Sequence, residues 1–158
     1  MFNLNMIICM FFSFLSCSER TSLPDVQLVE LGTGIAVNLA LDNGEAFYIV
    51  LSPFGCSSCL QYVSKIVELH GNNRTTPELK CIISTPIYQA AEAFGKHANL
   101  KIALLQDSTK SFQNYFSQKR KPVFFNFKQR EIKSSFIIEN HGNFEKIRQY
   151  ITNLRMGS

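Results

Sequence analysis

The sequence predicts one α/β domain in which a mixed β-sheet has helices on both faces. Apolar runs of strand length at residues 46–51, 79–84 and 100–105 alternate with segments in which apolar residues recur at helical spacing. That alternation is typical of buried strands joined by helices. Two further strand-like runs, 123–127 and 131–139, follow each other closely and predict an antiparallel pair. The 158 residues are enough for one such domain with its own core.

The strands are predicted from alternation and from turn residues. Residues 26–43 alternate after Gly34 and end in an Asp-Asn-Gly turn signal, so they predict a β-hairpin before the central strand 46–51. A helix over residues 28–39 is the alternative, and Gly32 and Gly34 disfavour it. Phe125 and Phe127 alternate with Phe124 across strand 123–127, which predicts core packing on both faces rather than an aromatic binding surface.

Four helices are predicted between and after these strands. The first covers residues 60–70 and ends at Gly71. The second, 87–94, follows Pro86, and the third, 110–117, follows a capping pair at residues 107–108. The last covers 143–154 and is amphipathic. Its apolar face consists of Phe144, Ile147, Ile151 and Leu154.

Residues 1–16 contain an apolar run of the length found in signal peptides and too short to span a bilayer comfortably. Phe14, Leu15 and Ser16 precede Cys17, and this order resembles a bacterial lipobox, in which the cysteine carries the lipid. We therefore expect a lipoprotein signal peptide at 1–16, a tether at 17–24 and the folded domain at 25–158. A secreted protein with an ordinary cleavage site and an uncleaved anchor are the alternatives. Each places the domain outside the cytoplasm, on the periplasmic side of a bacterial membrane, where disulfides persist.

Cys56 and Cys59 form a Cys-x-x-Cys pair between the central strand and the first helix. The start of a helix presents unpaired N–H groups and a partial positive charge, which favour a thiolate at Cys56. Cys59 lies one turn further on, within reach of a mixed disulfide formed at Cys56. A purely structural disulfide and a metal site are the alternatives. One such pair without a second pair or a nearby histidine supplies only two metal ligands, so we expect no metal and no other cofactor.

This pair, together with the later run from Lys121 and Pro122 through 125, resembles the thioredoxin superfamily and more closely its TlpA-like, membrane-tethered thiol-disulfide oxidoreductases. The resemblance covers residues 23–158. It implies a thioredoxin-like sandwich, dithiol chemistry at Cys56 and Cys59 with protein thiols or disulfides, and a membrane or periplasmic redox partner. In the family a cis-proline opens a strand beside the redox pair and its flanking backbone binds substrate. Pro122 stands in the matching place, so the resemblance implies a cis bond there.

Several residues around the pair are expected to tune it. Ser57 and Ser58 can hydrogen-bond a Cys56 thiolate and lower its pKa, and Phe54 and Gly55 occupy the place where relatives carry a tryptophan. Lys121, beside Arg120, would add positive charge near Cys56 and favour acidic partners.

Relatives often carry a buried acid about six residues before the first cysteine, and Val50 stands there instead. This absence leaves open a second hypothesis, a non-catalytic thioredoxin-like binding lipoprotein with a structural disulfide. A peroxidase of the peroxiredoxin kind is a third and weaker hypothesis, because residues 52–55 do not supply the Thr and Pro pattern of those enzymes. Cys81 lies in a predicted buried strand, and we interpret it as a packing residue.

The net charge of +4 is mild, and its densest patch is confined to residues 119–121. A nucleic-acid-binding domain usually carries a broader basic stripe. The composition therefore argues against nucleic acid as a partner and is compatible with a solvated loop or a contact to an acidic protein.

Overall fold

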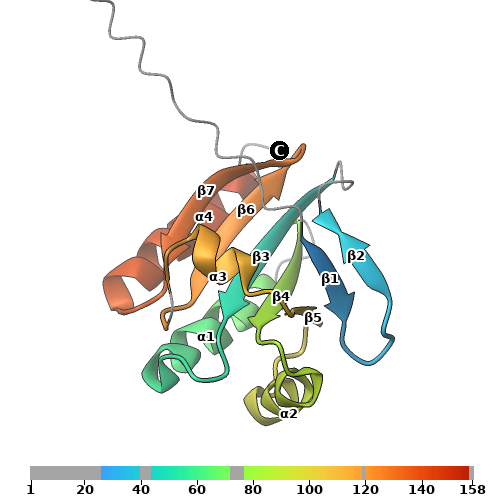
Figure 1. The fold of residues 1–158 in the computed structure, drawn as a ribbon. Coiled ribbons are helices and arrows are strands. Elements are labelled where there is room, and N and C mark those ends of the chain that lie inside the picture. Colours follow the sequence, from blue (N-terminus) through green and yellow to red (C-terminus); the bar gives the residue numbers. More distant parts are fainter. Residues whose placement is uncertain (1–25, 40–43, 72–76, 119, 157–158) are drawn as a thin grey trace, which may run out of the picture.

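The computed structural model describes residues 26–39, 44–71, 77–118 and 120–156. The predicted signal peptide, the tether and Cys17 lie outside the described residues. Across the described residues the chain forms one seven-stranded mixed sheet with helices on both faces (Figure 1). The predicted fold class is confirmed.

The sheet has the order β2-β1-β5-β4-β3-β6-β7. Its central strands β3, β4 and β5 are parallel, whereas β6 and β7 at one side and β1 and β2 at the other run antiparallel to their neighbours. The strands are β1 (Gln27–Glu30), β2 (Ala36–Asn38), β3 (Glu45–Leu51), β4 (Glu78–Ser84), β5 (Ala103–Asp107), β6 (Val123–Lys128) and β7 (Glu131–Ile137). The N-terminal hairpin is therefore confirmed, and it lies at the far side of the sheet from β6 and β7.

Helices α1, α2 and α4 contribute buried residues to one face of the sheet, and the short α3 covers the other (Figure 1). Their bounds are α1 (Leu60–Gly71), α2 (Tyr88–Ala98), α3 (Ser111–Tyr115) and α4 (His141–Met156). A single 3₁₀ turn, η2 (Ser57–Cys59), leads directly into α1. Within α4, Ile147 and Ile151 are fully buried, as the predicted apolar face requires.

The core consists of two clusters, one on each face of the sheet. Phe124 belongs to the cluster under α1, α2 and α4, and Phe125 and Phe127 belong to the one under α3. All three rings are 0% exposed, so the prediction of core packing is confirmed. Because six of the seven residues of β3 are buried, both faces of this strand are covered, and the loop that follows it starts from a rigid base.

Several element boundaries differ from the predictions; α2, for example, ends at Ala98 rather than at residue 94, and β7 ends at Ile137 rather than at residue 139. Strand β5 begins at Ala103, three residues later than predicted, because Leu100 and Ile102 pack against the core before the chain joins the sheet. Helix α3 is shorter than predicted and begins at Ser111. The carboxylate of the fully buried Asp107 accepts a hydrogen bond from the Phe112 N–H at 3.0 Å, so this residue stabilises the start of α3 as expected.

None of the described helices is both long enough and apolar enough to cross a bilayer.

Candidate redox site

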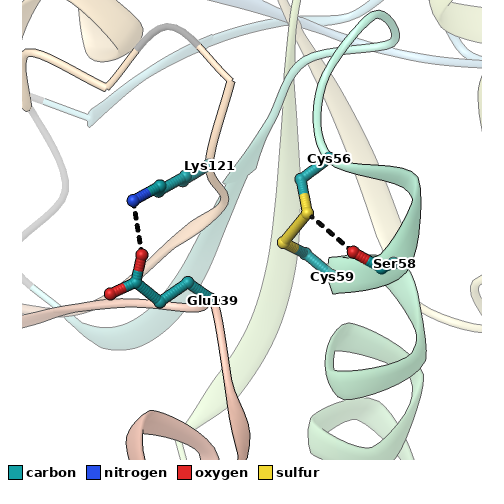
Figure 2. The surroundings of a disulfide bond; sticks show 5 residues. All are labelled: Cys56, Ser58, Cys59, Lys121 and Glu139. Atoms are coloured by element: carbon teal, nitrogen blue, oxygen red, sulfur yellow. Dashed lines mark hydrogen bonds and ion pairs between the residues drawn. A yellow bond between two sulfur atoms is a disulfide. The ribbon is translucent and has the colours of Figure 1, made fainter.

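Cys56 and Cys59 are joined by a disulfide at the end of the loop that leaves β3 (Figure 2). Their Cα atoms are 5.3 Å apart. Cys56 stands at the N-cap of η2, and its carbonyl accepts the Cys59 N–H at 3.1 Å. Because η2 continues into the twelve-residue α1, the disulfide occupies the N-terminal end of a helix, as the sequence predicted. Neither first turn carries an acidic residue, so no carboxylate from these turns opposes a thiolate there.

The two sulfur-bearing residues differ in burial. Cys56 is partly exposed, whereas Cys59, the last residue of η2, is only 1% exposed. A partner molecule can therefore approach Cys56 but not Cys59. This asymmetry is the one that a dithiol needs if one cysteine reacts with a partner and the other with the resulting mixed disulfide.

Gly55 allows the chain before β6 to approach the redox turn closely. The carbonyl oxygen of Arg120 accepts the Cys56 N–H at 2.8 Å. A Cβ atom on Gly55 would lie 2.6 Å from that same oxygen and 3.0 Å from the carbonyl of Ser52. Both contacts are to backbone, which cannot turn aside, so a side chain at this position would push the 120–122 segment away from Cys56.

The other residues expected to tune the pair have different surroundings. The Ser58 hydroxyl donates a hydrogen bond to Cys56 Sγ at 3.2 Å, the contact by which it would stabilise a thiolate (Figure 2). Ser57 is exposed, and in the described part of the chain its side chain forms no hydrogen bond with either sulfur. Phe54 is 77% exposed, so its ring is available to a partner rather than packed on the disulfide.

Pro122 is buried and immediately precedes β6, but its peptide bond is trans. The implied cis bond is therefore wrong. An X–Pro bond prefers trans by only about 0.5–1 kcal/mol, so the residue types alone do not decide the isomer. The trans chain satisfies both flanking carbonyls: Arg120 accepts from Cys56, and Pro122 accepts from the Ile138 N–H at 2.8 Å.

Lys121 does not add a free positive charge beside the disulfide, because its ammonium group forms an ion pair with Glu139. Figure 2 shows the Lys121 side chain directed toward Glu139 and away from the two sulfurs. Glu139 follows β7, eighteen residues after Lys121, and no pattern in the sequence connects the two. Sequence reasoning missed this residue, and only the antiparallel pairing of β6 and β7 brings it to the site.

Val50 and Cys81 are both buried residues of the sheet. Val50 is 4% exposed and faces the core, so the place that relatives fill with an acid is apolar here. Cys81 is a free thiol, fully buried in β4, and burial raises its pKa far above the usual value. It behaves as a small apolar residue. Among the described residues, no group of three or more potential ligands could hold a metal ion.

No family model and no curated protein sequence matches this chain. Solved structures do match it. A thioredoxin-like protein from Porphyromonas gingivalis has a TM-score of 0.65 at 16% identity, with 84% of this chain and 90% of that one covered. A secreted disulfide oxidoreductase from Mycobacterium tuberculosis, homologous to DsbE of E. coli, has a TM-score of 0.59 at 14% identity, with 82% and 96% covered.

StoA from Bacillus subtilis has a TM-score of 0.58 at 16% identity, with 82% of this chain and 98% of that one covered. At such identities, structural similarity establishes the fold and not the activity. The described part of this chain has a thioredoxin-like fold, with a Cys-x-x-Cys disulfide at the start of its first α-helix.

Proposed function

We propose that this protein is a thiol-disulfide oxidoreductase that exchanges disulfides with protein thiols through Cys56 and Cys59. The observation that carries the proposal is the asymmetric disulfide at the helix start, with Cys56 partly exposed and Cys59 buried. A solved structure of the same fold is described as that of a secreted disulfide oxidoreductase, which supports the same chemistry here.

In the reducing direction the Cys56 thiolate attacks one sulfur of a partner disulfide, and the other partner sulfur leaves as a thiolate. The Cys59 thiolate then attacks Cys56 Sγ and expels the second partner sulfur. The partner gains two electrons, and this chain is left with the observed disulfide. The steps run backwards when a partner dithiol meets the disulfide form. A second protein dithiol or disulfide, in the membrane or periplasm, must restore the starting state.

The chain segment at 120–122 would bind the partner's backbone. No described residue forms a backbone hydrogen bond with Lys121, whereas its neighbours Arg120 and Pro122 use their carbonyls to hold the segment in place. An extended partner strand could therefore pair with Lys121 next to Cys56. The exposed Phe54 ring lies just before Cys56 in the chain and offers apolar contact area.

The test is trapping combined with a redox titration. Cys59→Ser should accumulate mixed disulfides at Cys56, Cys56→Ser should accumulate none, and insulin reduction should be lost in both. The matched control is Cys81→Ala, which removes a buried thiol outside the redox pair and should leave both assays unchanged. We expect a potential within the catalytic range of about −120 to −270 mV. A potential below about −300 mV, with insulin reduction unaffected by Cys56→Ser, would instead indicate a binding protein with a structural disulfide.

We further propose that the domain is exported and held at the membrane by a lipid on Cys17. The apolar run at 1–16 and the order of residues before Cys17 support this, as does the description of one similar structure as secreted. Expression in a bacterial host with labelled palmitate should yield a labelled mature chain that begins at Cys17. Cys17→Ala should abolish the label. A labelled Cys17→Ala variant, or an unlabelled native chain, would contradict lipidation.

A further inference from the structure

The segment from Arg120 to Pro122 is anchored at three points. The Arg120 carbonyl accepts from the Cys56 N–H, and the Pro122 carbonyl accepts from the Ile138 N–H, both at 2.8 Å. Between them, the Lys121 side chain forms an ion pair with Glu139. The backbone bonds fix the ends of the segment. Among the described residues, Glu139 is the one that pairs with the Lys121 side chain and sets its direction (Figure 2).

That direction matters because a lysine has four rotatable methylenes and would otherwise sample many positions around the redox turn. A positive charge near a cysteine stabilises its thiolate, and a carboxylate has the opposite effect. The Lys121 and Glu139 side chains are 50% and 36% exposed. Their pairing therefore contributes little to stability, but it decides where the Lys121 charge resides.

We propose that Glu139 is a positioning residue that holds Lys121 away from the disulfide and thereby restrains the reactivity of reduced Cys56. This role rests on the proposed function, in which Cys56 is the reacting thiol. When Glu139 is removed, the Lys121 ammonium is released and can move toward Cys56 Sγ. In the native chain, therefore, Glu139 acts on Cys56 through Lys121 and does not itself touch the reacting atoms.

Other charged groups in this region remain the same in every variant below. Arg120 is exposed, has no ion-pair partner among the described residues and is not substituted in any variant. On α4, Lys146 lines the same surface groove as Glu139. His141 is also on α4 and lies 3.8 Å from Glu145, which in turn pairs with Arg148 at 2.6 Å.

The first measurement is the rate of Cys56 alkylation by iodoacetamide between pH 4 and 9, in a Cys59→Ala background of the full chain. We expect Glu139→Gln to raise the rate at pH 5 by about threefold or more and to leave the plateau at high pH unchanged. A threefold gain corresponds to a decrease of about half a unit in the pKa of Cys56. With both cysteines present, the oxidation equilibrium against glutathione should shift toward the dithiol by a similar factor.

The second measurement separates positioning from a direct effect of the carboxylate charge. If Glu139 acts through Lys121, Glu139→Gln should change the rate of Cys56 alkylation at pH 5 by less than about 1.5-fold in a Lys121→Met background. The matched control is Glu131→Gln, which breaks an equally exposed pair with Lys133 at the other end of β7. Glu131 is separated from Ile137, at the redox end of β7, by the length of the strand, about 20 Å at about 3.3 Å per residue, so the rate should not change.

The outcomes distinguish this inference from the proposed function. If Cys56 exchanges disulfides normally and Glu139→Gln leaves its alkylation profile unchanged, the positioning role is wrong while the proposed function stands. The same follows if Glu139→Gln has an equal effect in the Lys121→Met background. If Cys56 fails to form mixed disulfides in the native chain, the proposed function is wrong, and the positioning role is lost with it.

Discussion

The two ends of the β3–β6 pair both carry a Glu–Lys ion pair, but in contrasting surroundings. At the end away from the disulfide, Glu45 accepts from Lys128 at 2.9 Å and from Asn126 at 3.1 Å. Asn126 is only 2% exposed and also donates to the Tyr150 hydroxyl at 2.9 Å. At the redox end, the Lys121–Glu139 pair is exposed, and the backbone bond between Cys56 and Arg120 links its segment to the disulfide.

The contrast shows that residue types alone do not assign a role to an ion pair. A carboxylate that shares a partly buried network with an amide and a hydroxyl is tied to the stability of the fold, because each bond lost leaves another group unsatisfied. An exposed pair contributes little to stability and can exchange partners at little cost. We therefore expect changes at the Asn126 end to affect unfolding, and changes at the Cys56 end to affect redox chemistry.

The largest effect is expected from Gly55→Ala, which disrupts the packing between the redox turn and the 120–122 segment. The added methyl would meet the Arg120 and Ser52 carbonyls, so the 120–122 segment must move and the Cys56 N–H loses its acceptor. We expect a loss of about tenfold or more in insulin reduction, because small misplacements of reacting groups are costly, and a decrease of about 1–3 kcal/mol in the free energy of unfolding.

The matched control is Gly71→Ala at the end of α1, where an added methyl meets no described atom within 4 Å. This variant should keep both the activity and the stability. Full activity in Gly55→Ala would show that the close approach of the 120–122 segment has no part in the chemistry.

Much of this end of the molecule was predictable. The Cys56–Cys59 pair, its place at a helix start and the strand after Pro122 follow from local patterns, because small residues, helical spacing and β-branched or aromatic runs act over a few positions. The contacts of Gly55 with Arg120 and of Lys121 with Glu139 do not follow from such patterns. They join segments that only the sheet register brings together, and that register depends on the whole core.

The start of strand β5 and the isomer of the bond before Pro122 are two further features that local sequence patterns do not determine. Leu100 and Ile102 continue an apolar run into β5, but they pack on the core rather than pair in the sheet, and a one-dimensional pattern does not distinguish these two uses. The trans bond before Pro122 is compatible with carbonyl partners on Cys56 and Ile138, neither of which is adjacent in sequence.

The second prediction concerns the opposite end of the pair. Asn126→Ala removes the donor to Glu45 and to Tyr150, so it should lower the free energy of unfolding by about 1–2 kcal/mol. The Cys56–Cys59 potential should not change. Urea unfolding and a glutathione titration measure the two quantities. The control is Asn114→Ala on the exposed side of α3, which should leave both unchanged. A shift in potential with Asn126→Ala would mean that the two ends are coupled.

The smallest effect is the pH dependence that Glu45 gives to stability. Partial burial raises the pKa of Glu45, but the hydrogen bonds from Lys128 and Asn126 and the Lys128 charge outweigh it, so the pKa lies below its usual value of 4.5. A lowered pKa means that the folded state favours the ionised form. The stabilisation is therefore complete above pH 4.5 and is lost as the pH falls through the folded-state pKa.

Glu45→Gln should accordingly cost about 1 kcal/mol or less at pH 7, and the difference from the native chain should shrink steadily below pH 4.5. Urea unfolding of both proteins at several pH values between 3 and 7 measures it. Glu92→Gln on α2, which breaks an exposed pair with Lys96, controls for the loss of a surface charge. A Glu45→Gln difference that grows toward acid would require a raised pKa, which is inconsistent with a Glu45 carboxylate stabilised by Lys128 and Asn126.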